Sequence, residues 1–152
     1  MRAEAVKLTR SFAYATLDYR LTLINRTDHA MHELAVAADL VSAHGQAPME
    51  QQVALPGTLL PVQHTLARLS PGQSQQLKGQ VRLPIGDAQV IHQGRLPLLV
   101  PLLRVRIDGA GEDPLARTFV IGQGVPDGGR LQPFRLDEGP RSYQPIAQRA
   151  LD

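Results

Sequence analysis

The sequence of 152 residues contains no cysteine, so disulfide bonds, thiol catalysis and cysteine-ligated metal sites are excluded. It also lacks tryptophan, and three tyrosines and three phenylalanines are its only aromatic residues. The longest apolar run, 96–103, contains two prolines, and no segment reaches the roughly 18 apolar residues that a membrane-spanning helix needs. We therefore expect no direct insertion of this segment into a membrane.

The first residues lack the apolar stretch of a secretory signal peptide. We expect a cytoplasmic protein if the chain is complete, and an extracytoplasmic or membrane-associated one if it is excised from a longer chain. The sequence does not indicate an oligomeric state.

An excess of charge of one sign is missing as well. Sixteen basic and 14 acidic residues give a net charge of +2, and residues 1–76 hold six of each sign. There is no run of five like charges. Nucleic-acid binders usually carry a basic stripe with stacking aromatic side chains. We therefore expect no nucleic-acid partner.

The composition is that of a globular domain, with 43% apolar and 20% charged residues. The length fits one domain, and 13 glycines with 12 prolines indicate frequent turns. A strand is predicted over Ala13–Leu23, where apolar residues occupy the odd positions and polar residues most of the even ones. Turn-forming residues follow at 25–29. Segment 32–40 alternates again and is predicted as the return strand of a hairpin, with a short helix as the alternative.

Further strands are predicted at 63–69 and 77–83, joined by a Pro-Gly turn at Ser70–Ser74. Pro48 suits the first turn of a short helix over Met49–Ala54.

The apolar segment 96–107 contains Pro97 and Pro101, which cannot donate ladder hydrogen bonds. Its first half is therefore predicted as an edge strand or as a crossing between sheets. A second hairpin is predicted over 103–121, with its turn at 108–114. The tail is expected to form a helical turn near Ile146–Leu151.

About seven strands and few helices indicate an all-β protein, a single antiparallel immunoglobulin-like β-sandwich. We place this sandwich at residues 1–129. Residues 130–152 form a C-terminal extension that packs on the domain or docks to a partner.

Two stretches resemble bacterial immunoglobulin-like modules of the CARDB type and their relatives. The first is Leu21–Asn25, leading into the alternating segment Leu34–Ser42, and the second is the turn Leu69–Ser74 before the strand Gln76–Leu83. The resemblance covers residues 13–83, about half of the chain. It implies a non-catalytic domain of an envelope or surface protein, and it implies no active-site residues.

Candidate chemistry is sparse. His29, His32 and Glu33 lie within five residues, but in a turn entering a strand they point to opposite faces and do not form a metal site. The adjacent carboxylates Glu112-Asp113 and Asp137-Glu138 lie in loops, where solvation leaves no raised pKa for acid catalysis. Asn25-Arg-Thr27 fits a glycosylation acceptor, but a turn asparagine is the preferred interpretation. We expect no enzyme, no cofactor and no metal.

Two regions are candidates for partner contact: the apolar run, as an exposed edge, and the tail, as a docking motif. The residues assigned to this role are Leu96, Leu98, Val100, Phe134, Arg135, Arg141 and Tyr143. The competing interpretations are a kinked buried strand and a tail packed along its own domain.

The sequence therefore predicts a non-catalytic protein-interaction or spacer module, part of a larger bacterial envelope-associated protein. Its partner would be another protein or other domains of the same polypeptide. The alternative is a domain that binds carbohydrate or another small ligand, although the few aromatic residues supply little stacking surface for sugars.

Overall fold

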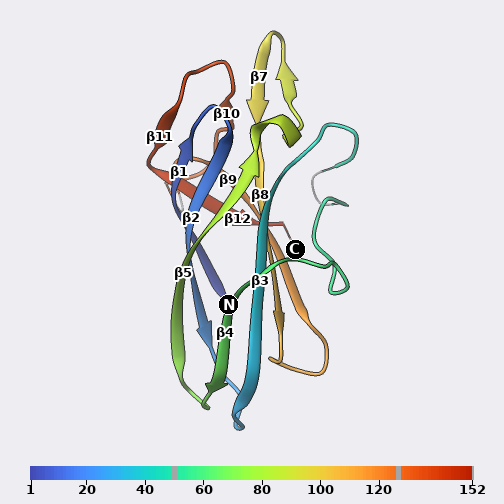
Figure 1. The fold of residues 1–152 in the computed structure, drawn as a ribbon, viewed down its shortest axis with the longest axis vertical. Coiled ribbons are helices and arrows are strands. Elements are labelled where there is room, and N and C mark those ends of the chain that lie inside the picture. Colours follow the sequence, from blue (N-terminus) through green and yellow to red (C-terminus); the bar gives the residue numbers. More distant parts are fainter. Residues whose placement is uncertain (49–50, 126–127, 152) are drawn as a thin grey trace.

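The computed structural model describes residues 1–48, 51–125 and 128–151, and its regular secondary structure consists almost entirely of β-strands (Figure 1). A single three-residue 3₁₀ turn, η2 (Ile85–Asp87), is its one named helical element in these ranges. The strands are β1 (Arg2–Arg10), β2 (Tyr14–Ile24), β3 (Met31–Ser42), β4 (Val62–Leu69), β5 (Ser74–Pro84), β6 (Ile91–Gln93), β7 (Leu96–Leu99), β8 (Pro101–Asp108), β9 (Leu115–Gln123), β10 (Phe134–Arg135), β11 (Arg141–Tyr143) and β12 (Ile146–Ala150).

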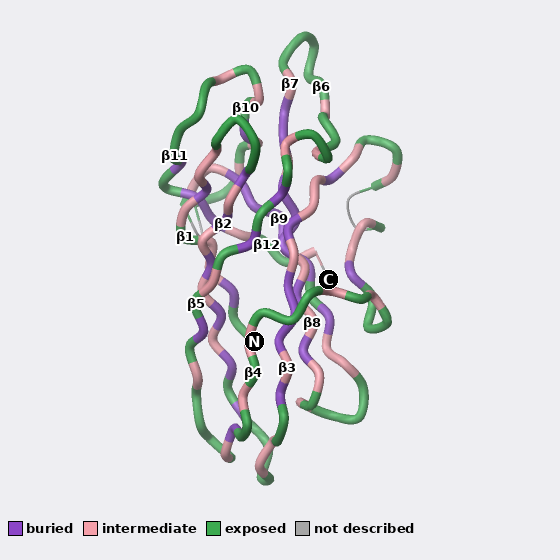
Figure 2. Tube along the Cα trace, viewed as in Figure 1, coloured by how far each residue is buried: buried purple, intermediate pink, exposed green. Residues whose placement is uncertain are grey.

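The strands form three antiparallel sheets. Their orders are β11-β1-β2-β5, β12-β9-β8-β3-β4 and, for the small third sheet, β10-β7-β6. Side chains from both larger sheets, such as Leu17 of β2 and Leu103 of β8, belong to one buried core. Along the backbone, buried stretches recur in strands of both sheets, for example in β3, β5 and β8 (Figure 2). The expected all-β, antiparallel class is confirmed. The number of strands is twelve over the described residues rather than about seven.

The alternation predicted for Ala13–Leu23 is confirmed in β2 from Ala15 onward, whereas Ala13 precedes the strand and is exposed. Ala15, Leu17, Tyr19, Leu21 and Leu23 are all buried, and the residues between them are half-buried. In β3 the even positions from Leu34 to Leu40 are buried in the same way. A period of two thus marks the inward faces of both strands.

The predicted hairpin between these two strands is wrong. β2 pairs with β1 and β5, whereas β3 pairs with β4 and β8, so the two strands lie in different sheets. β2 and β3 both direct apolar side chains into the same core. Each strand therefore shows the period of two, whether the strands pair within one sheet or face each other from two sheets. The Pro-Gly turn between β4 and β5 is also a link between sheets.

Asn25 ties these two links together at one end of the molecule. It is fully buried, and its side-chain amide donates hydrogen bonds to the carbonyls of His29 and Leu69, both at 2.9 Å. Its side-chain oxygen accepts from the backbone N–H of Thr27 at 3.0 Å. Its backbone N–H donates to Gln73, and its carbonyl accepts from Gly72. This geometry confirms the turn interpretation of Asn25.

The apolar run 96–103 is divided between two sheets. β7 belongs to the three-stranded sheet and β8 to the five-stranded one, so the predicted crossing is confirmed. The edge alternative is wrong, because β7 is the middle strand of its sheet, and Pro97 pairs with His92 there. The second predicted hairpin is confirmed as β8 and β9, with Leu103 opposite Phe119.

The last strands are added to all three sheets: β10 to β7, β11 to β1 and β12 to β9. The helical turn predicted near Ile146–Leu151 is wrong, since Ile146–Ala150 pairs along β9 instead. Of the helix predicted over 49–54, residues 49 and 50 lie outside the described residues, Gln51 has 3₁₀ geometry, and 52–54 are not helical. In the described ranges, no helix has the length and apolar character required to cross a bilayer.

Candidate functional site

The histidines singled out in the sequence lie on the surface. His29 is exposed, and its Nδ1 lies 3.1 Å from a carboxylate oxygen of Asp28. His32 and Glu33 are exposed at the start of β3. Over the parts of the chain that the structure describes, no group of three or more histidines and carboxylates is placed to hold a metal ion.

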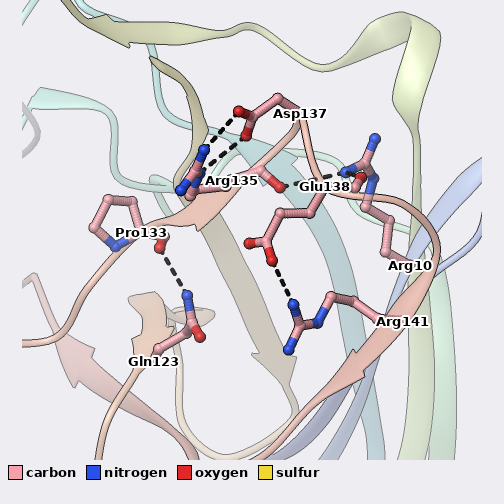
Figure 3. A network of polar contacts seen from close by, with 7 residues as sticks. All are labelled: Arg10, Gln123, Pro133, Arg135, Asp137, Glu138 and Arg141. Atoms are coloured by element: carbon pink, nitrogen blue, oxygen red, sulfur yellow. Dashed lines mark hydrogen bonds and ion pairs between the residues drawn. The ribbon is translucent and has the colours of Figure 1, made fainter.

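The paired carboxylates of the tail belong to a surface network (Figure 3). Arg135 donates two hydrogen bonds to Asp137, at 3.0 and 2.7 Å, and Arg141 forms an ion pair with Glu138. Arg10, at the end of β1, donates to the main-chain oxygens of Arg135 and Glu138. The hydrogen bond from Arg135 lowers the pKa of Asp137, whereas a general acid at neutral pH needs a raised pKa. This network fastens the tail to β1.

A titratable pair that the sequence did not indicate, buried Tyr19 and half-buried His64, links the two larger sheets. The Tyr19 hydroxyl of β2 lies 2.9 Å from Nε2 of His64 on β4, and the two rings meet edge to face. Burial raises the pKa of Tyr19 to about 12 and lowers the pKa of His64. Gly79 leaves room for this pair, because a Cβ atom there would lie 2.4 Å from the Tyr19 hydroxyl oxygen. The one sequence signal is a glycine at an inward position of an otherwise apolar alternation.

The residues assigned to partner contact gather in one corner, where β10 pairs with β7 and β11 with β1. Leu98, Phe134 and Tyr143 are buried there, and Val100 is half-buried. The rings of Phe134 and Tyr143 meet edge to face at 5.0 Å between centroids.

Among the remaining residues of that set, Leu96 is partly exposed. Arg135 and Arg141 are exposed and ion-paired, and the Arg141 guanidinium lies 5.0 Å from the centre of the Tyr143 ring. The buried members of this set contribute to the protein's own packing, and the exposed surface left here is largely charged.

A different surface combines exposed apolar side chains with unpaired backbone. Edge strand β4 has a neighbour on one side only, β3. The segment leading into it, Leu55–Val62, exposes Leu59 by 88% and Val62 by 59%, and Leu55 is exposed as well. Sequence reasoning gave this segment no role. The feature of the sequence that could have indicated it is a cluster of apolar residues outside the predicted strands.

No protein-family model, no curated protein and no solved structure matches this chain.

Proposed function

We propose that the chain is an immunoglobulin-like β-sandwich that acts as a non-catalytic protein-interaction module and pairs through edge strand β4. The observation that carries this proposal is an eight-residue edge strand preceded by exposed apolar side chains. Such edges offer free N–H and C=O groups to an incoming strand, and the side chains beside them supply apolar contact.

The topology supports the immunoglobulin-like part of the proposal. The layer β1-β2-β5 faces the layer β9-β8-β3-β4, which together make seven strands, the number expected for such a sandwich. The remaining strands are additions at the edges of these layers and in the small third sheet. On this view, the sequence indicated the core of the module and missed its additions.

A comparison of the four edges of the two larger sheets singles out β4. Edge β11 is only three residues long, and β12 is held against β1 by a 2.8 Å hydrogen bond from the Ala5 N–H to the Gln148 side chain. Edge β5 carries Lys78 and Arg82 and ends in a proline, features that oppose strand addition. Edge β4 contains no lysine or proline, and its one formal charge, Arg68, lies near its end.

We propose that the partner of edge strand β4 is the same strand of a second copy of this chain. When two β4 strands pair in antiparallel orientation about Thr65, His64 faces Leu66, and Arg68 lies opposite the region of Val62, where β4 has a register shift against β3. No like charges meet in this register. The same operation on β5 about Gln80 would place Lys78 opposite Arg82, which destabilises the pairing.

The carbohydrate alternative finds little support. Tyr19, Tyr143, Phe119 and Phe134 are buried in the core. Only Phe12 and Tyr14 remain exposed, and the guanidinium of Arg82 lies 5.3 Å from the centre of the Tyr14 ring.

Light scattering over a series of protein concentrations tests the proposal. We expect a monomer–dimer equilibrium that Thr65→Lys shifts to monomer, because two lysines would then face each other across the two-fold axis. Gln76→Lys, an exposed position on β5, is the matched control and should leave the equilibrium unchanged. A strict monomer at millimolar concentration, or equal loss of dimer in both variants, would overturn the proposal.

A further inference from the structure

An open cavity lies between the two larger sheets, at the end where β2 passes to β3 and β4 passes to β5. Its volume is about 520 Å³, within the range of small-molecule sites. Buried side chains from both sheets form its floor: Leu23, Leu34, Leu69 and Ile107.

The walls are apolar but incompletely covered. Met31 and Leu115 are half-buried in the wall, and Ile24 lies partly exposed at the opening. Methionine adapts to irregular apolar partners because it is unbranched and flexible. The floor is already shielded from water, so a hydrocarbon chain entering here would cover the walls and would itself leave water, which favours binding.

The charged side chains that line the cavity all have the same sign. Arg2 and Arg26 line the cavity, and no carboxylate does. The side chain of Arg2 is 77% exposed, and its guanidinium lies 3.7 Å from a carboxylate oxygen of Glu4. Such a long, exposed ion pair is weak, so the Arg2 side chain can reorient toward a ligand. Within the described ranges, Arg26 forms no ion pair. An anionic group at the mouth would therefore meet two cations.

The loop that carries Arg26 is held in place before any ligand binds. Asn25 anchors its start through the two hydrogen bonds to His29 and Leu69. The Thr27 hydroxyl donates to the Asn25 side-chain oxygen at 2.6 Å. A preformed wall reduces the entropy that a ligand must overcome.

We propose that this cavity binds a single-chain amphiphile with a carboxylate head, the chemistry of a fatty acid. The acyl chain lies on the Leu23, Leu34 and Ile107 floor, and the carboxylate lies between Arg2 and Arg26. Apolar burial supplies most of the affinity, and the arginines select the sign of the head group. Leu69, the last residue of β4, contributes to the floor of this site, but the outward edge of β4 does not line it. Failure of the proposed self-association would therefore leave the site untouched.

Calorimetric titration of the full chain with dodecanoate, kept below its micelle concentration, tests the site. We expect saturable one-to-one binding that strengthens about threefold to fourfold for each added methylene, as expected for apolar burial. Dodecyltrimethylammonium should bind more weakly than dodecanoate, and the difference should shrink at high salt. Equal binding of the anionic and cationic chains, or no saturable binding of dodecanoate, would overturn the proposal.

Two pairs of variants locate the site. Arg26→Gln should weaken dodecanoate binding about threefold to fivefold, the scale of an exposed ion pair, whereas Arg95→Gln, in the exposed turn between β6 and β7, should not. Ala110→Phe should fill the cavity and abolish binding, whereas Ala88→Phe, which is equally half-buried but does not line the cavity, should preserve it. Thermal unfolding of each variant verifies that it is folded. Undiminished binding in folded Ala110→Phe would place the ligand elsewhere and contradict the proposal.

Discussion

The side-chain amide of Asn25 donates a 2.9 Å hydrogen bond to the carbonyl of Leu69, 44 residues away along the chain. This bond joins the end of β2, in one sheet, to the end of β4, in the other. Asn25 is fully buried, so each of its polar atoms depends on such partners. We predict that Asn25→Ala lowers the free energy of unfolding by about 2–4 kcal/mol, because it leaves several buried groups without partners. Chemical denaturation measures this loss.

Asp28→Ala is the control for that change. Asp28 lies in the same loop between β2 and β3, but its carboxylate is fully exposed. The side chain that this carboxylate contacts is that of the neighbouring His29. Its loss should change the stability by less than about 0.5 kcal/mol, as for most surface substitutions. Similar losses in the two variants would show that Asn25 does not hold the sheets together.

Replacement of Gly79 by a larger residue is predicted to lower the stability of the protein, because Tyr19 lies directly against it. A Cβ at position 79 would lie 2.7 Å from the Cζ atom of that ring, and the ring is packed in the core. We expect Gly79→Ala to cost about 1–3 kcal/mol, the usual range for overpacking. The loss should shrink in a Tyr19→Leu background, which a double-mutant cycle measures. Gly86→Ala, where the added atom meets nothing within 4 Å, should cost much less.

Tyr19 should also make stability depend on pH. Burial raises its pKa from 10.0 to about 12, so the folded chain binds the phenol proton more tightly than the unfolded chain does. This contribution is fully present below pH 10 and is lost as the pH rises from about 10 to about 12, by up to about 3 kcal/mol. The stability difference between wild type and Tyr19→Phe, measured by denaturation at pH 8 and pH 11, should therefore shrink at the higher pH. Tyr14→Phe, at an exposed tyrosine, is the control, and equal behaviour of the two variants would contradict the prediction.

The sequence predicted the positions of strands correctly where the alternation of apolar and polar residues depends on one strand alone. Alternation located β2 and β5, and the Pro-Gly turn located the break between β4 and β5. The sequence was misleading about which strands pair. Segments 13–23 and 32–40 both alternate, and two strands show this alternation whether they are neighbours in one sheet or face each other across the core. The strand at Ile146–Ala150 was missed because its partner, β9, is supplied by the tertiary structure rather than by local propensity.

The candidate surfaces show the same limit. The apolar residues proposed for partner contact include Leu98 and Phe134, which are buried by strands that meet only in the folded chain. The cavity above Leu23 and Ile107 is assembled from both sheets, so no local segment indicates it. The pairing of Tyr19 with His64 likewise depends on two strands in opposite layers.

The central claim, that β4 pairs with its counterpart in a second copy about Thr65, has a direct test in this cysteine-free chain. In antiparallel pairs, facing Cα atoms lie about 4.5–5.5 Å apart, within the range of a disulfide. Thr65→Cys should therefore form a covalent dimer rapidly under mild oxidation, as seen by non-reducing electrophoresis, whereas Gln76→Cys on β5 should remain monomeric. If Thr65→Cys cross-links no faster than Gln76→Cys at concentrations that favour association, the claim is contradicted.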